Sequence, residues 1–288
     1  MNNNQRPAIA AHLTQIPGHG LRGVKNVIAI GSGKGGVGKS TVTVNLAIAL
    51  AQQGARVGVL DADIYGPSVP IMLGEVNPVI CENDRYVPIT AHGIQAMSMG
   101  YLTNETNSTL IWRGPMLSKA LLQMLDITQW HDLDYLLIDL PPGTGDIQLS
   151  LVQKIPLAGA IVVTTPQTVA TQDADKALNL FEKTNIHVLG VIENMAYYQC
   201  TRCGEPNHVF GQDGAEALCQ KHGCTHLGTL PLDAQISQDG DNGTPSARAQ
   251  IAPGPIHAAF KQIAHNVQQA LSLRPVNYAH KMPPVVVK

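Results

Sequence analysis

The chain has 288 residues, of which 14% are charged and 4% are aromatic, and its formal net charge is −2. This balance gives no basic surface for nucleic acid, and no apolar run approaches the roughly 18 residues that cross a membrane. The polar N-terminus lacks the apolar centre of a signal peptide, and an odd count of five cysteines argues against a disulfide framework. We therefore expect a cytoplasmic protein without nucleic-acid or membrane partners.

Strand and helix patterns alternate along the chain. Glycines interrupt residues 1–24, which we expect to be a flexible lead-in to one domain over 25–273, with a C-terminal tail over 274–288. Strands are predicted over 26–30, 57–60, 135–138, 161–164, 187–192 and 227–230, and helices over 40–53, 170–183, 215–222 and 256–273. Residues 78–99 alternate like a hairpin at a sheet edge, and 195–212 form an irregular cysteine-containing insertion. The alternation predicts an α/β fold, a mostly parallel sheet with helices on both faces.

A glycine-rich loop lies between the first predicted strand and helix. It reads GSGKGGVGKST over 31–41 and satisfies G-x-x-x-x-G-K-[ST] from Gly33 to Ser40. Its glycines let backbone N–H groups converge on phosphate oxygens, and Lys39 is expected to reach the β- and γ-phosphates. The Ser40 hydroxyl is a ligand type that Mg²⁺ takes. A chance glycine turn is the alternative, and the strand–loop–helix setting disfavours it.

Carboxylates end two further strands. Asp61 and Asp63 follow the strand over 57–60, and Asp139 follows the strand over 135–138. Ligands bind at the carboxyl ends of strands in such sheets, where carboxylates can fix Mg²⁺ or orient a water molecule. In the loop after Asp139, Gly143 can present a bare backbone N–H to a γ-phosphate, whereas Asp146 caps a helix or takes part in the site.

A second lysine, Lys34, makes the loop a K-G-G-x-G-K-[ST] sequence. This form resembles the deviant Walker A class of dimeric P-loop ATPases, which includes nitrogenase iron protein, MinD/ParA and the Mrp/ApbC iron–sulfur carriers. The continuation DADIYGPS over 61–68 and the string WRGPM from Trp112 are similar to the Mrp/ApbC versions. A solvated loop lysine, and a plain helix start at Trp112, are the alternatives.

The resemblance implies roles for individual residues. It implies a homodimer in which Lys34 reaches the partner's nucleotide, with Lys39 also catalytic, Asp63 activating water and Asp61 in the outer shell of Mg²⁺. Ser40 and Asp139 would hold the metal. ATP would be bound by Gly33, Lys34, Gly35, Gly36, Val37, Gly38, Lys39, Ser40, Thr41, Asn194, Pro231 and Asp233. Asn194 and the Pro-x-Asp at 231–233 are also ordinary turn chemistry.

Cys200 and Cys203 form a C-x-x-C pair after the predicted strand over 187–192. Two thiolates at this spacing can hold one edge of a metal cluster, whereas a [4Fe–4S] cluster takes four thiolates, which a two-fold dimer would supply. The Mrp/ApbC resemblance implies such a transferable cluster between subunits. An intrachain zinc site that adds Cys219 and Cys224 is an alternative, although Cys219 also falls on the apolar side of its predicted helix. A redox C-x-x-C would instead open a helix.

These features favour an ATP-hydrolysing carrier that binds a [4Fe–4S] cluster at a homodimer interface and passes it to apo-proteins. The rival, from another functional class, is a MinD/ParA-like positioning ATPase, a switch that binds a polymer or a surface. That rival would need an amphipathic membrane-seeking tail or a basic surface, and the proline-containing, weakly charged residues after 273 give neither. A third interpretation keeps the ATPase and makes the cysteines a structural zinc site.

Overall fold

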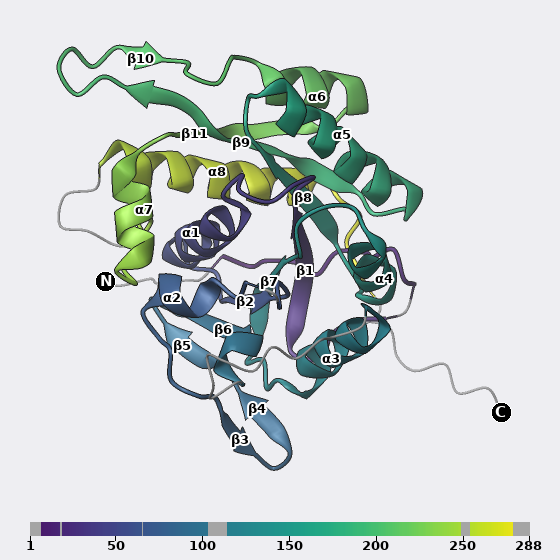
Figure 1. Cartoon of the computed structure of the whole chain (residues 1–288). Coiled ribbons are helices and arrows are strands. Elements are labelled where there is room, and N and C mark those ends of the chain that lie inside the picture. The colour runs from purple at the N-terminus through teal and green to yellow at the C-terminus, as the bar shows by residue number, and fades with distance from the viewer. Residues whose placement is uncertain (1–6, 18, 65, 103–113, 249–253, 279–288) are drawn as a thin grey trace, which may run out of the picture.

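The computed structural model describes residues 7–17, 19–64, 66–102, 114–248 and 254–278. The strands of its central sheet are β1 (Val24–Gly31), β2 (Val57–Asp61), β5 (Ile89–Ala91), β6 (Ile94–Ser98), β7 (Leu133–Asp139), β8 (Gly159–Thr164), β9 (Val188–Gln199), β10 (Pro206–Asn207) and β11 (Thr225–Pro231). They run in the order β10-β9-β8-β1-β7-β2-β6-β5, and β11 also pairs with β9 (Figure 1). All pairs are parallel except β5 with β6 and β10 with β9, so the predicted mostly parallel sheet is confirmed.

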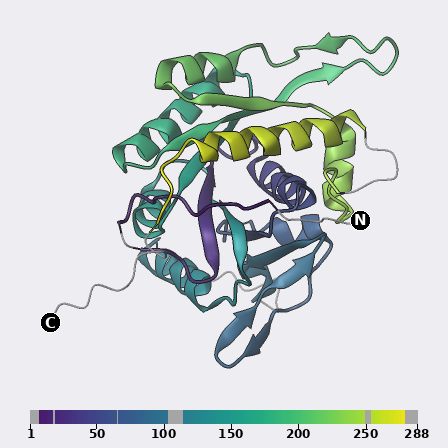
Figure 2. The ribbon, with the colours of Figure 1, turned by 180° about the vertical axis from the view of Figure 1, so that it is seen from behind.

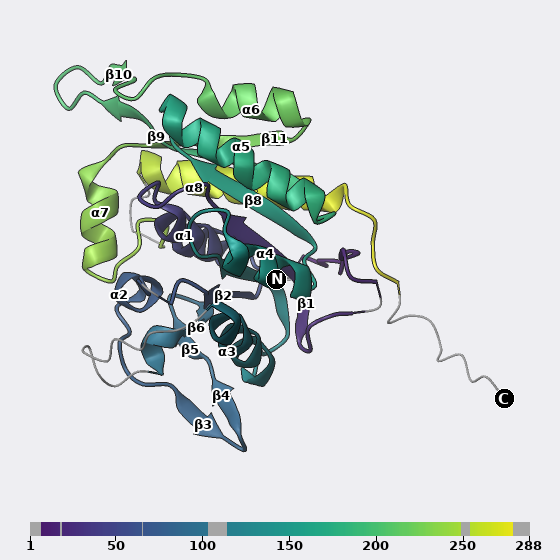
Figure 3. The same cartoon turned by 45° about the vertical axis from the view of Figure 1, so that its right-hand side comes forward.

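Helices cover both faces of this sheet, as expected. They are α1 (Lys39–Gln52), α2 (Val69–Leu73), α3 (Gly114–Ile127), α4 (Asp146–Lys154), α5 (Thr168–Lys183), α6 (Gly214–His222), α7 (Ala234–Asp241) and α8 (Pro255–Ser272), with a 3₁₀ turn η1 at Met99–Tyr101. Aliphatic side chains of α1 and α8 pack on one face, where Figure 2 shows α8 crossing the sheet. Side chains of α3 to α6 pack on the other face, which Figure 3 brings forward. Burial on both faces explains why the central strands are continuous apolar runs.

The hairpin region over 78–99 forms two hairpins. β3 (Ile80–Glu82) and β4 (Arg85–Val87) pair only with each other, whereas β5 turns into β6 and forms the antiparallel edge of the main sheet. Antiparallel strands at an edge were therefore predicted correctly. Trp112 and Arg113 lie outside the described residues. Among those described, no helix is both long and apolar enough to cross a bilayer.

The cysteine-containing segment is more regular than expected. β9 continues through Gln199, and β10 pairs back on it, so Cys200 begins the turn of a β-hairpin. Met195, with φ of 55°, lies where the pairing of β9 with β11 shifts register. The last residues of β9, Tyr198 and Gln199, are exposed beyond the packed core, so the strand continues there without the buried apolar run that marks its first part.

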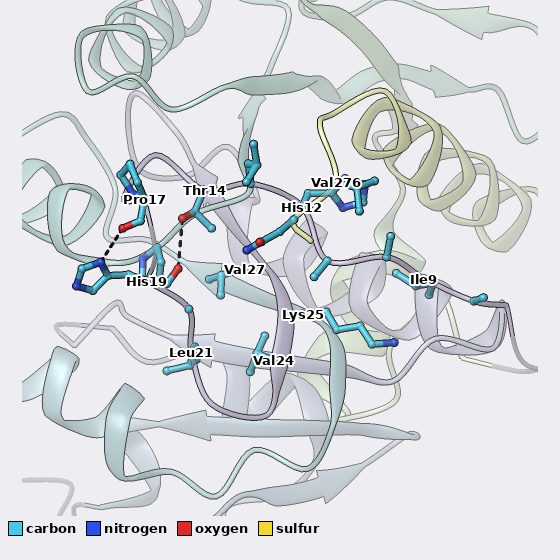
Figure 4. A pocket seen from close by; sticks show the side chains of 17 residues that line it. Ile9, His12, Thr14, Pro17, His19, Leu21, Val24, Lys25, Val27 and Val276 are labelled. Carbon is cyan, nitrogen blue, oxygen red and sulfur yellow. Dashed lines mark hydrogen bonds between the residues drawn. The ribbon is translucent and has the colours of Figure 1, made fainter. Parts of the chain in front are cut away.

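The N-terminal segment packs against the domain in its described part, in contrast to the flexible lead-in expected from its glycines. Asn26 Oδ1 accepts the backbone N–H of His12 at 3.0 Å, and Leu13 donates to the carbonyl of Pro275 at 2.9 Å. Gln15 binds the end of α4, with Nε2 2.6 Å from the Ile155 carbonyl oxygen. Between this segment and the start of β1 lies a mostly apolar cavity of about 930 Å³ (Figure 4).

Candidate functional site

The loop between β1 and α1 is packed so closely that two of its glycines are required by space. A Cβ on Gly33 would lie 2.0 Å from the carbonyl carbon of Asp173 in α5, and one on Gly38 would lie 2.2 Å from Nδ2 of Asn194. Gly38 also has φ of 81°, in the left-handed region that favours glycine. Asn194 donates to the Val37 carbonyl at 2.9 Å. The loop therefore lies against α5 and β9 at the N-terminus of α1, an arrangement that binds phosphate.

Asp139, fully buried at the end of β7, gathers three side chains of α1. Its Oδ1 lies 2.7 Å from Nζ of Lys39, and its Oδ2 accepts the Ser40 hydroxyl at 2.5 Å. The Thr43 hydroxyl donates to Oδ1 at 2.8 Å. Thr43 was missed from the sequence, although its position one helical turn after Lys39 puts both on one side of α1. The predicted phosphate-binding Lys39 and the predicted metal ligand Ser40 thus both contact the carboxylate of Asp139.

Asp61 ends β2 directly beside Asp139, with which it is in register. Burial, followed by the charge of Asp139, raises the pKa of Asp61 to about 7, while the charge of Lys39 opposes the shift. Its Oδ1 accepts the backbone N–H of Asp63 at 3.1 Å, and its Oδ2 accepts the Ser98 hydroxyl at 3.0 Å. Ser98 lies in register with Asp61 on β6, an alignment that no local motif indicates.

Oxygen donors of Ser40, Asp61 and Asp139 therefore converge at the carboxyl edge of the sheet, beside the phosphate-binding loop. Hydroxyl and carboxylate oxygens are the ligands that Mg²⁺ prefers, and the metal usually keeps several waters as well. Lys39 supplies positive charge on the same side. The residues present fit a nucleotide phosphate with its magnesium ion.

The remaining predicted residues lie outside the cluster around Asp139. Lys34 is partly exposed within the loop. Pro231 ends β11 opposite Tyr197, and Asp233 caps α7 by accepting the backbone N–H of Gln235 at 2.8 Å. Asp146 lies in the first turn of α4, whose N-cap is Gly145. Contacts of Asn194, Pro231 and Asp233 with a base stay predictions.

The two paired cysteines lie on the turn between β9 and β10. The backbone N–H of Cys200 donates to the backbone carbonyl of Glu205 at 3.0 Å, and the backbone N–H of Gly204 donates to the Cys200 carbonyl at 2.8 Å. Hydrogen bonds from the backbone N–H groups of Cys203 and then Arg202 lower the pKa of the Cys200 thiol. Cys203 is exposed, and both line a cavity of about 680 Å³. This turn favours the thiolate, the form that binds metals.

The other two cysteines do not join this pair. Cys219 lies on the buried face of α6, as its place on the apolar side of the predicted helix indicated. Its hydrogen bond with the Cys224 thiol, followed by burial, raises the pKa of Cys219. Across the described ranges, no group of three or more His, Cys, Asp or Glu side chains is arranged to hold a metal ion. The described residues therefore do not gather the four cysteines as an intrachain zinc site would require.

Comparisons with known proteins identify the family of this chain. A ParA family model described as NUBPL iron-transfer P-loop NTPase matches residues 23–268. The iron–sulfur cluster carrier protein of Pseudomonas fragi is 52% identical over 259 residues, covering 89% of this chain and 90% of its own length. The iron–sulfur cluster carrier protein of Escherichia coli K12 is 51% identical over 254 residues, which cover 88% of this chain and 68% of the carrier's own length.

Solved structures share the fold. A nucleotide-binding protein of Archaeoglobus fulgidus, in complex with ADP, has a TM-score of 0.68 and 38% identity, covering 77% of this chain and 88% of its own. The cell-division ATPase MinD of Pyrococcus furiosus has a TM-score of 0.64 at 22% identity, and the match covers 85% of this chain and 98% of MinD. At that identity the likeness to MinD concerns the fold alone.

Proposed function

The chain belongs to the ParA-type family of NUBPL iron-transfer P-loop NTPases, and we propose that it is an ATP-hydrolysing carrier that delivers iron–sulfur clusters to apo-proteins. The observation that carries this proposal is a pair of thiols, Cys200 and Cys203, on a hairpin that continues from the strand bearing Asn194. One strand thus runs from the phosphate-binding loop to the turn that holds the thiols. Nucleotide state and cluster binding would act on the same element.

In the nucleotide site, backbone N–H groups of residues 33–41 bind the phosphates, and Lys39 moves from Asp139 onto the β- and γ-phosphates. Ser40 and Asp139 would hold Mg²⁺, which would supply positive charge against the phosphates, and Asp61 would lie beside it in an outer-shell role. Asp63 orients the attacking water, and its place is fixed by its backbone bond to Asp61. Lys34 acts on the nucleotide of the partner copy in a homodimer.

In the cluster site, each chain supplies two thiolates to a [4Fe–4S] cargo that takes four. A two-fold axis beside the hairpin brings together Cys200 and Cys203 of both copies, which completes the set without any ligand from the core. The exposure of Cys203 suits a cluster that must be released as well as bound.

Anaerobic reconstitution with iron and sulfide tests this proposal. The wild-type protein is expected to become brown and to hold about four irons per dimer. The double variant Cys200→Ala/Cys203→Ala should stay colourless, whereas Cys81→Ala, which removes an exposed cysteine of β3, should load normally. Loaded protein should also restore the activity of an apo-enzyme that needs a [4Fe–4S] cluster.

Three results would contradict the proposal. The wild-type protein could stay colourless, or the double variant could load as the wild type does. The protein could instead retain equimolar zinc through dialysis, which would make the exposed pair a structural zinc site. Hydrolysis is measured separately as phosphate release from Mg–ATP, with Lys39→Ala as the inactive reference.

A further inference from the structure

A buried carboxamide, that of Gln148, lies next to the phosphate-binding loop. Gln148, in the first turns of α4, is 2% exposed, and neither its Nε2 nor its Oε1 has a partner among the described residues. Buried polar groups are paired in the great majority of cases, and an unpaired one destabilises the fold that contains it. An apolar side chain of similar size would suit this position better in the conformation observed.

The position of Gln148 links the two loops that surround the phosphates. Its Nε2 lies 3.3 Å from where a Cβ on Gly31 would be, at the end of β1 and the start of the phosphate-binding loop. It also lies just beyond the Pro141–Gly145 loop that connects Asp139 to α4. The unpaired N–H groups therefore lie at the junction of both loops.

One hydrogen bond already joins these loops. The backbone N–H of Gly143 donates to the carbonyl of Ser32 at 3.1 Å, and Ser32 is fully buried. If Gly143 turns its N–H to a bound γ-phosphate, as its sequence context predicts, the Ser32 carbonyl loses this donor. Leaving a buried carbonyl unpaired would oppose that movement.

We propose that Gln148 is a positioning residue of the hydrolytic site, whose carboxamide N–H replaces that of Gly143 on the Ser32 carbonyl when the Pro141–Gly145 loop closes on the γ-phosphate. This inference rests on the proposed function. The exchange keeps the Ser32 carbonyl paired in both conformations. In the open form the Gln148 carboxamide is unpaired, whereas in the closed form it bonds to Ser32 and no carbonyl is left without a donor. Gln148 thereby destabilises the open form and favours the closed one.

Two variants separate this role from a merely structural one. Gln148→Leu removes the amide with little change in volume, and Gln153→Leu makes the same change at an exposed position of the same helix. Thermal unfolding is measured without nucleotide, with Mg–ADP and with Mg²⁺ and a non-hydrolysable ATP analogue. Phosphate release from Mg–ATP gives kcat and KM.

Without nucleotide, Gln148→Leu is expected to raise Tm by about 2–4 °C, because it removes an unpaired buried group. The additional Tm increase that the ATP analogue gives over ADP should shrink in this variant. Loss of one hydrogen bond in the closed form should lower kcat by about tenfold, with a smaller change in KM. Gln153→Leu should match the wild type in all of these measurements.

The inference is overturned if Gln148→Leu lowers Tm without nucleotide while the analogue-specific increase and kcat remain those of the wild type. That result would mean that the amide is already bonded in the open form and only supports the fold. Failure of the proposed function looks different, because the wild type and Gln153→Leu would then release no phosphate either.

Discussion

Two glycines of the phosphate-binding loop differ in their surroundings. A Cβ on Gly33 would overlap the backbone of Asp173, whereas the same atom on Gly35 would meet only the Pro142 side chain, at 3.9 Å. Overlap with backbone cannot be relieved by turning a side chain, so the loop or α5 must move. Gly33 is therefore fixed by packing against α5, and Gly35 is free of that constraint.

Gly33→Ala is expected to lower the free energy of unfolding by about 1–3 kcal/mol, as overpacking against backbone does. It should also weaken nucleotide binding, because the displaced loop no longer directs its N–H groups at the phosphates. Gly35→Ala serves as the matched control and should change stability by less than about 0.5 kcal/mol. Urea denaturation and ADP titration measure both effects. Equal losses in the two variants would contradict the assignment of Gly33 to packing.

At this scale, the sequence could predict the residues that occur in motifs. Lys39 and Asp139 each follow a recognisable pattern, and the fold brings them within 2.7 Å. Ser98 and Gln148 are ordinary polar residues in sequence, and they become notable only through strand register and burial. No local spacing specifies which strand lies beside Asp61, so these neighbours required the structure.

At the scale of elements, those with a local sequence pattern were predicted, and those that depend on distant partners were missed. The core strands and the long helices are specified by their own apolar patterns, and those were found. The described part of the N-terminal segment packs on the domain where a flexible lead-in was expected, because it hydrogen-bonds to partners that are distant in the sequence. Gln15, for example, binds the end of α4 through Ile155. Glycines report local freedom, whereas long-range hydrogen bonds decide whether a segment packs.

The contact between α5 and α6 gives a prediction for pH. His222 is 6% exposed and lies 2.7 Å from both Asp175 and Glu182. Burial opposes its charge, but hydrogen bonds to the two carboxylates outweigh burial and raise the pKa of His222. A raised pKa in the folded state means that this stabilisation is complete below about pH 6.5 and is lost as pH rises through the folded pKa.

His222→Gln should therefore cost about 1 kcal/mol of unfolding free energy at pH 6 and less at pH 8.5. Urea denaturation at both pH values measures the difference. His265→Gln, an exposed histidine of α8, is the control and should shift neither value. If the cost of His222→Gln were the same at both pH values, the contact would not depend on the charge of the imidazole.

At the scale of the whole molecule, one chain holds half of each proposed site. It supplies two thiols for a cluster that takes four, and a partly exposed Lys34 whose proposed target lies in another copy. The two halves are independent, since one concerns sulfur ligands and the other phosphate charge. A single two-fold arrangement would complete both, which is why nucleotide and cluster would be coupled through the dimer.

Mixed dimers test whether Lys34 acts across the interface. Lys34→Ala and Asp63→Asn chains should each bind nucleotide and be inactive alone. In a mixed dimer, the Lys34→Ala chain still has Asp63 and the Asp63→Asn chain still has Lys34. If Lys34 acts across the interface, these two intact residues meet at the nucleotide of the Lys34→Ala chain. With random mixing, half of the dimers are mixed and one site in two is complete, so about a quarter of wild-type phosphate release should return. If Lys34 acts within its own chain, no mixed dimer holds a complete site, and the mixture stays as inactive as its components.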